Sequence, residues 1–381
     1  MLSRYWHLSQ FYLFYFASLG ALVPYWSVYL NHLKFTSLEI GQLMATLAIS
    51  KVIAPYLWGW IADKTGYHIR IVQIVSFCSI LCFLPLLWYD SFWMMMGFML
   101  LFSFFWNASL PQFEVVTLAR LGEHKHRYSE IRLWGSLGFI LTAALMGWLF
   151  QYVSISFLPA ILLVIFVMIL VASFQVKEHR QKQVCSDNIW TVISKPAVIS
   201  LLLACFFMQA SHGPYYTFYS LNMENLDYSR FSIGLLWSLG VLAEVILFGF
   251  MYRLLRYKPA NVWLVFSLFL TAVRWVMMAW LLDSLFFVIL SQCLHAASFG
   301  LFHAAAIHLI HDYFPQHSGR GQALYASVSF GAGGAIGSLY AGSLWDQFPP
   351  SFTFMVAAGI AFIGMLISLK VTNPEHASVS S

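Results

Sequence analysis

Twelve apolar stretches, separated by short polar segments, limit the possible folds of this chain more than any other feature. They cover residues 8–30, 38–60, 70–89, 92–114, 132–151, 156–175, 197–221, 232–252, 261–282, 285–309, 321–343 and 351–370. A helix needs about 20 mostly apolar residues to cross the hydrocarbon core of a bilayer. Because lipid offers no hydrogen-bond partner to an open backbone, we predict an all-α membrane protein with twelve transmembrane helices.

The composition excludes a soluble protein. Hydrophobic residues make up 60% of the chain and charged residues only 9%, whereas a soluble domain carries about 25% charged residues. The first stretch, 8–30, is too long for the apolar region of a signal peptide, and no small-residue cleavage site follows it. We therefore expect this stretch to be retained as the first membrane helix.

The basic residues predict an orientation in the membrane. With the N-terminus in the cytoplasm, 15 of the 20 Lys and Arg fall in the cytoplasmic loops or at the cytoplasmic ends, and only Lys34 and Arg230 fall in outer loops. Cytoplasmic loops are enriched in Lys and Arg. We therefore expect both termini to lie in the cytoplasm and the lipid bilayer to be a partner of the chain. The positive charge then orients the chain, and we expect no nucleic-acid partner.

An internal repeat divides the chain into halves. A shift of 193 residues aligns 14–53 on 207–246 without a gap, with 11 of 40 positions identical, and it places Lys51 on Glu244. The longest polar segment, 176–195, lies between the halves. Two parallel halves with a site near the midplane are typical of one large group of secondary transporters. We predict two pseudo-symmetric six-helix bundles, 1–175 and 196–381, joined by a cytoplasmic linker at 176–195.

A motif after the second stretch resembles the signature of the major facilitator superfamily. The segment GWIADKTGYHIR, residues 59–70, matches that signature between its second and third helices. The matching positions are Gly59, Asp63, Lys64, Gly66 and Arg70. The resemblance implies the major facilitator fold and a gating loop made by these five residues. The alternative interpretation is an ordinary polar loop after a helix.

Charged residues within the spans resemble those of the lactose permease family. Glu114 and Arg132 lie 18 residues apart across one loop, and Glu244, Arg274 and His295 stand where that family has an acid, an arginine and a histidine. In that family the arginine of the first pair contacts substrate. One departure is Ser298, which stands where that family has its proton-coupling acid. The segments RLWGSLGF, LWSLGVLAEVI and LHAASFGLFHAA are closer to the phenylpropionate permease group of bacterial proton symporters.

Polar residues inside membrane spans are functional candidates by default. The candidates for substrate binding are Lys51, Arg132, Glu114, Arg274, His212 and Tyr215. The candidates for proton coupling are Glu244, His295, His303 and Glu114. A carboxyl group in apolar surroundings beside a movable cation can bind and release a proton, and histidine titrates near neutral pH.

Several of these candidates also have a structural interpretation. Arg132 could be an interfacial anchor, and Lys51 and Arg274 could form structural ion pairs. His303 could be a helix-packing residue, and the aromatic residues around Tyr215 could pack at the outer interface.

These residues together predict a secondary active transporter. The resemblance implies proton-coupled uptake of a small organic solute by alternating access across a bacterial cytoplasmic (inner) membrane, with an aromatic monocarboxylate such as 3-phenylpropionate as the expected substrate. The alternatives are a sugar or nucleoside proton symporter and, less favoured, a drug or metabolite exporter. No nucleophile–base pair, nucleotide loop or metal motif stands out, so we expect no enzyme activity, no metal and no cofactor. The expected working form is a monomer driven by the proton gradient.

Overall fold

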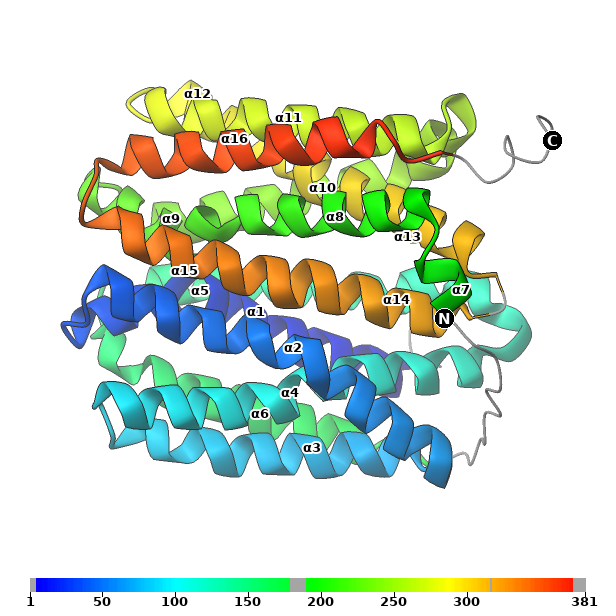
Figure 1. Cartoon of the computed structure of the whole chain (residues 1–381). Helices are drawn as coiled ribbons and strands as arrows, with labels where there is room; N and C mark the ends of the chain where they lie inside the picture. The colour runs from blue at the N-terminus through cyan, green and yellow to red at the C-terminus, as the bar shows by residue number, and fades with distance from the viewer. Residues whose placement is uncertain (1–4, 179–189, 316, 373–381) are drawn as a thin grey trace. The chain divides into compact units, whose positions relative to one another are not determined.

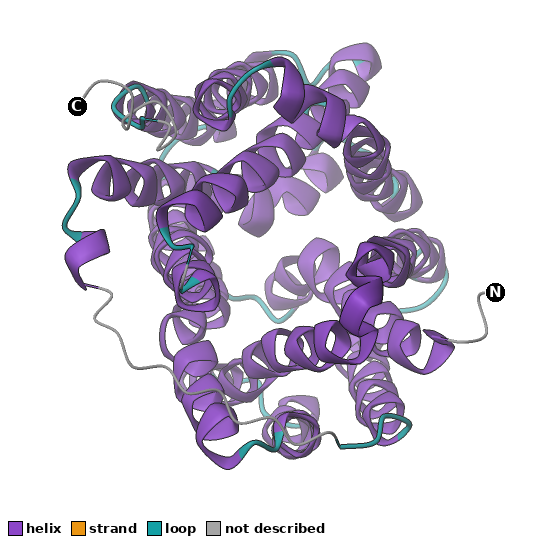
Figure 2. Ribbon diagram, turned by 90° about the vertical axis from the view of Figure 1, so that its right-hand side faces the viewer, coloured by secondary structure: helices purple, strands orange, loops and turns teal. Residues whose placement is uncertain are grey.

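A computed structural model describes residues 5–178, 190–315 and 317–372 of the chain. The described residues are helical almost throughout and contain no β-strand (Figure 2). Eleven helical runs among them are long and apolar enough to cross a membrane. A twelfth run of helix, residues 318–345, covers the predicted stretch 321–343. The predicted all-α membrane protein is therefore confirmed.

The first six spans form mostly unbroken helices (Figure 1). They are α1 (Trp6–His32), α2 (Ser37–Thr65), α3 (His68–Phe83) with a 3-10 turn at Leu84–Leu87, α4 (Phe92–Leu121), α5 (Tyr128–Leu149) and α6 (Leu158–Phe174). Thr36 begins α2 with a capping box, in which its side chain and that of Glu39 each bond the other's backbone N–H. Gly66 ends α2 in the left-handed conformation, with φ 75°, which glycine adopts without a steric penalty.

The second six spans are less regular. They comprise α8 (Pro196–Ser211) and α9 (Gly213–Asn225), α10 (Arg230–Tyr257), α11 (Ala260–Trp280), α12 (Leu285–Cys293) with α13 (Phe302–Tyr313), α14 (Ser318–Ala326) with α15 (Gly334–Trp345), and α16 (Pro350–Ser368); a short helix, α7 (Trp190–Ile193), precedes them. The helix boundary at His212 divides the predicted span 197–221. Two π-helical segments, η5 (Ala296–Leu301) and η6 (Ser327–Gly333), interrupt two others. Such segments often mark functional sites.

The described residues fall into two compact units. The first unit lies within Met1–Cys185 and Tyr219–Ser238, and the second within Ser186–Phe218 and Leu239–Ser381. The two predicted bundles, 1–175 and 196–381, stay a prediction. Residues 179–189 of the predicted linker, 176–195, lie outside the described residues.

In the first unit, α1 and α5 pack with their backbones almost in contact. A Cβ added to Gly20 would lie 2.6 Å from the carbonyl oxygen of Phe139, and one added to Gly138 would lie 2.2 Å from that of Leu13. Small residues at a helix crossing allow this approach, which supplies van der Waals contact where lipid removes the hydrophobic driving force. The crossing holds α5, and with it Arg132, against α1.

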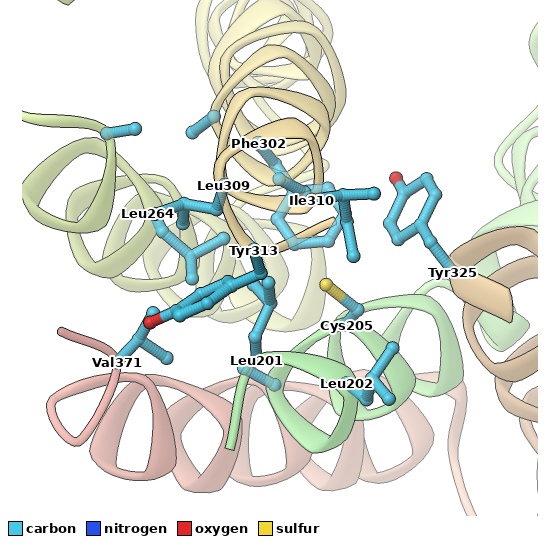
Figure 3. Packing of buried hydrophobic residues seen from close by; sticks show 14 of the residues in the cluster. Leu201, Leu202, Cys205, Leu264, Phe302, Leu309, Ile310, Tyr313, Tyr325 and Val371 are labelled. Carbon is cyan, nitrogen blue, oxygen red and sulfur yellow. The ribbon is translucent and has the colours of Figure 1, made fainter. Parts of the chain in front are cut away.

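In the second unit, a cluster of buried apolar residues joins α8, α11, α13 and α14 (Figure 3). Leu201 and Cys205 of α8 meet Leu264 of α11 and Ile310 of α13 in this cluster. Tyr325 of α14 reaches into it and is 1% exposed. The cluster anchors α11, which carries Arg274, and α13, which carries His303.

The α1–α5 crossing generates a stability prediction. Gly138→Ala would place a methyl group against the Leu13 backbone, and such overpacking costs roughly 1–3 kcal/mol. We therefore expect a clear fall in the thermal unfolding midpoint of the purified protein in detergent. The matched control is Gly97→Ala, because Gly97 has open space around its Cβ position. Equal midpoints for the two variants would contradict the close crossing.

Candidate functional site

One polar group in the first unit joins α4 to α5. The Tyr128 hydroxyl donates a hydrogen bond of 3.0 Å to Oε1 of Glu114. The Nε atom of Arg132 lies 4.0 Å from the same oxygen. The structure thus brings the predicted Glu114 and Arg132 together, and it adds Tyr128, which the sequence did not single out.

The guanidinium group of Arg132 rests on an aromatic face. Its central carbon lies 3.9 Å from the ring centre of Phe16 in α1, a cation–π contact. Gly135 leaves room for this stack, because a Cβ there would lie 2.8 Å from both Arg132 Nη1 and Phe16. The Arg132 side chain is 33% exposed. It makes no hydrogen bond within the described part of the chain.

Lys51 lies near the middle of α2 and is half-buried. It shares a helix face with the buried residues Leu47 and Ala54, four residues before and three after it, and not with the exposed Ile49 and Ile53. Among the residues that the structure describes, Lys51 has no hydrogen-bond or ion-pair partner. Its ammonium group is therefore a cation on the inward face of α2, and no acidic side chain among the described residues compensates its charge.

Arg274 in the second unit is fully buried, at 0% exposure. Its Nε donates to the carbonyl of Ser291 at 2.8 Å, and its Nη1 donates to Oγ of Ser298 at 2.9 Å and to Nδ1 of His295 at 3.2 Å. Its guanidinium also lies 4.3 Å from the ring centre of Tyr215. Ser298, the residue that departs from the family resemblance, is thus a direct partner of this arginine.

His295 connects Arg274 to Glu244. Because a guanidinium only donates, Nδ1 of His295 accepts, and its proton belongs on Nε2. That Nε2 lies 3.8 Å from Oε2 of Glu244. Gly300 in η5 makes room for the acid, because a Cβ there would lie 2.9 Å from Glu244 Cγ. At this separation the imidazole and the carboxyl face one another without a direct hydrogen bond, close enough for the charge of one to act on the other.

The other candidates of the second unit have their own partners. The Tyr215 hydroxyl donates to Oε1 of Gln292 at 2.9 Å. His212 is 0% exposed, and its Nδ1 lies 2.8 Å from the carbonyl oxygen of Met208. His303 pairs with the Tyr325 hydroxyl at 3.0 Å. A separate aromatic ring, that of Phe299, is stacked between His295 and His303.

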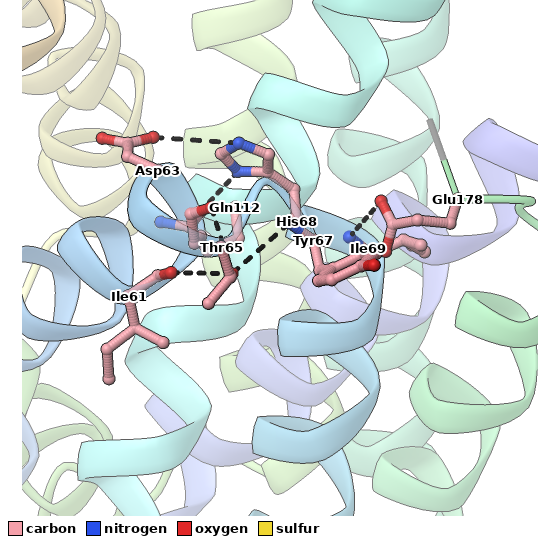
Figure 4. A network of polar contacts seen from close by, with 9 residues as sticks. Ile61, Asp63, Thr65, Tyr67, His68, Ile69, Gln112 and Glu178 are labelled. Atoms are coloured by element: carbon pink, nitrogen blue, oxygen red, sulfur yellow. Dashed lines mark hydrogen bonds and ion pairs between the residues drawn. The ribbon is translucent and has the colours of Figure 1, made fainter. Parts of the chain in front are cut away.

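The predicted gating loop is part of a polar network that joins the end of α2, the start of α3 and the side of α4 (Figure 4). Nδ1 of His68 bonds Oε1 of Gln112 at 3.0 Å, so it carries a proton. A second proton on Nε2 would face Asp63, whose Oδ1 is 3.8 Å away. Gly59 lies beside Gln112, since a Cβ there would be 3.3 Å from the amide nitrogen. The sequence missed His68 and Gln112 because their contacts join distant segments.

The remaining loop residues lie around this network. Lys64 lies over the Trp60 ring and Arg70 over the Tyr67 ring. Glu178 caps the start of α3, since its carboxylate accepts from the N–H groups of Ile69 at 3.3 Å and Arg70 at 2.9 Å. An anion is stabilised at a helix N-terminus by these free donors and by the helix dipole. The segment after α6 is thereby attached to the predicted gating loop.

Comparison with known proteins shows which family the chain belongs to. A family model described as the MFS_1 like family matches residues 5–356. The chain belongs to the major facilitator superfamily. A crystal structure of a mutant of the nucleoside transporter NupG matches with a TM-score of 0.85 at 15% identity, covering 96% of this chain and 99% of that one. The major facilitator fold is therefore confirmed.

Two curated relatives are transporters. A probable 3-phenylpropionic acid transporter of Escherichia coli is 29% identical over 373 residues, 94% of this chain and 96% of the relative. A maltose permease of Geobacillus stearothermophilus is 23% identical over 377 residues, 96% of this chain and 94% of the relative. This member of the major facilitator superfamily is thus a multi-pass membrane transporter and not an enzyme.

The Glu178 cap generates a prediction for the facilitator's loop. Glu178→Gln removes a carboxylate worth about 0.3–1 kcal/mol at a helix N-terminus. We therefore expect the amide hydrogens of Ile69 and Arg70 to exchange about two- to fivefold faster, measured by hydrogen–deuterium exchange. Glu123→Gln is the control, because Glu123 is exposed. Unchanged exchange in Glu178→Gln would show that the cap does not hold the start of α3.

Proposed function

We propose that this transporter takes up a small aromatic monocarboxylate, such as 3-phenylpropionate, together with protons by alternating access. The observation that carries the substrate class is the state of Arg132. This guanidinium is partly exposed, stacked on Phe16, and makes no hydrogen bond to the described residues. A guanidinium fork matches a carboxylate in both charge and geometry.

Phe16 and Lys51 support the same substrate class. The Phe16 ring carries Arg132 on one face and is itself partly exposed, so the rest of the ring offers apolar surface against which an aromatic ring can pack. Lys51 supplies a second cation without an acidic partner in the described residues. A charge placed inside a membrane protein is costly unless it is compensated. An anionic substrate would supply this compensation.

Arg274 has a different part in this proposal. Its hydrogen bonds to Ser291, Ser298 and His295 occupy it within the protein. We assign it the orientation of His295, whose Nε2 faces Glu244. Glu244 and His295 then form the proton-binding pair, which takes the place of the family acid at the position of Ser298.

The relatives support the substrate without deciding it. The Escherichia coli relative is named for 3-phenylpropionic acid, and identity of 29% transfers a substrate only by analogy. A sugar or nucleoside symporter is the second candidate. The Glu114 carboxylate beside Tyr128 offers acceptors for substrate hydroxyl groups, and other matches are named for maltose and nucleosides. We place the protein in a bacterial cytoplasmic membrane, as a monomer with both termini inside.

Uptake into proteoliposomes tests the substrate. Labelled 3-phenylpropionate is supplied outside under an inward proton gradient, and uptake by empty liposomes is subtracted. We expect saturable uptake whose kcat/KM falls about tenfold or more in Lys51→Gln and Arg132→Gln, because each loses a charged hydrogen bond. Arg256→Gln, at an exposed cation, is the control. Uptake equal to that of empty liposomes, or competition by sugars and nucleosides alone, would contradict the proposal.

A variant of Glu244 tests the coupling of transport to protons. Glu244→Gln cannot bind and release a proton, so we expect it to lose accumulation driven by the gradient. Exchange of labelled for unlabelled substrate at equal concentrations should remain, because it needs no net proton movement. A protonophore should abolish accumulation by the wild type. Gradient-driven accumulation by Glu244→Gln at the wild-type level would remove Glu244 from the coupling step.

A further inference from the structure

One carboxylate oxygen lies between two possible donors. Oε1 of Glu114 accepts from the Tyr128 hydroxyl at 3.0 Å, and Nε of Arg132 is 4.0 Å away. A bonded guanidinium–carboxylate pair has its nitrogen and oxygen about 2.7–2.9 Å apart. The Arg132 nitrogen is therefore roughly an ångström farther from the Glu114 oxygen than in a bonded pair, and the hydroxyl of Tyr128 holds that same oxygen by a hydrogen bond.

The chain around this group explains why it stays open. Tyr128 begins α5 and lies one turn before Arg132, so both side chains lie on one helix face. On its other side the guanidinium is stacked on Phe16, and Gly135 leaves the space for that stack. Arg132 is thus held toward α1, while Tyr128 holds Glu114 of α4.

We propose that Tyr128 is a positioning residue that keeps Glu114 from closing onto Arg132 and so leaves the guanidinium available to the substrate carboxylate. This inference rests on the proposed function in one respect, which is that the substrate is an anion. A closed Glu114–Arg132 pair would have to open before the anion could bind. Tyr128 removes that competition without removing the negative charge of Glu114.

Transport kinetics test this role with a rescue. In Tyr128→Phe the hydroxyl is lost, Glu114 closes onto Arg132, and the KM for 3-phenylpropionate rises about fivefold with kcat unchanged, the size expected for a partly exposed ion pair. In the proposed function Glu114 neither binds the substrate nor carries the coupled proton, so adding Glu114→Gln to Tyr128→Phe removes only the competing charge and restores the KM. Adding Glu130→Gln does not, although Glu130 is a nearby carboxylate that pairs with Arg127.

The rescue separates positioning from other roles of Tyr128. If Tyr128 only stabilised the fold or touched the substrate, Glu114→Gln would leave the raised KM unchanged, and that result would overturn the proposal. An unchanged KM in Tyr128→Phe would overturn it as well. Thermal unfolding midpoints of all variants confirm that the comparison is made between folded proteins.

A second measurement needs no substrate. Phenylglyoxal modifies accessible arginine side chains, and mass spectrometry of the peptide that carries Arg132 gives the rate. We expect this rate to fall about fivefold in Tyr128→Phe and to return with Glu114→Gln, while the exposed Arg256 reacts equally in every variant. If wild type fails to transport 3-phenylpropionate but this pattern holds, the substrate proposal fails and the role of Tyr128 stands. An Arg132 rate unaffected by Tyr128→Phe overturns that role even where transport is confirmed.

Discussion

A bilayer offers no partner to a buried charge, and the polar organisation of this protein follows from that constraint. The buried charge of Arg274 is compensated by hydrogen bonds to a backbone carbonyl, a serine hydroxyl and an imidazole. Glu114 accepts a hydrogen bond from the hydroxyl of Tyr128. Arg132 rests on an aromatic face. The spans are thus built around a few charges whose compensation differs between the two units, and these differences suggest different functions.

Glycine residues in the helices make these arrangements possible. Gly135 gives Arg132 its place beside Phe16, and Gly300, within the π-helical η5, gives Glu244 its place beside His295. A side chain at either position would enter the space that the charged group now fills. The same residue type serves two purposes in this fold, since Gly20 and Gly138 bring α1 and α5 into close contact while Gly135 and Gly300 leave room for charges.

The sequence was sufficient for the spans, because length and hydropathy are local properties. It also identified the charged residues within the spans, and it paired Glu114 with Arg132 through a family resemblance. It did not single out Tyr128, Gln112 or Glu178, because a sequence does not show which side chain a polar group contacts, and Gln112 and Glu178 also lie far along the chain from their partners. The sequence did not predict the π-helical segments either, because an apolar stretch has the same hydropathy whether it forms an α-helix or a π-helix. The repeat-mates Lys51 and Glu244 also differ in surroundings, because Glu244 faces His295 and Lys51 has no acidic partner among the described residues.

In the proposed function, the available guanidinium of Arg132 in the first unit selects an anionic substrate. Equilibrium binding of a matched pair tests it most directly, with 3-phenylpropionate and its neutral amide, 3-phenylpropanamide, titrated into purified protein in a calorimeter. We predict that the wild type binds 3-phenylpropionate about tenfold tighter, or more, than the amide. Arg132→Gln should lose this preference while still binding the amide. Equal affinity for the two compounds in the wild type, or a preference that survives in Arg132→Gln, would contradict this proposal.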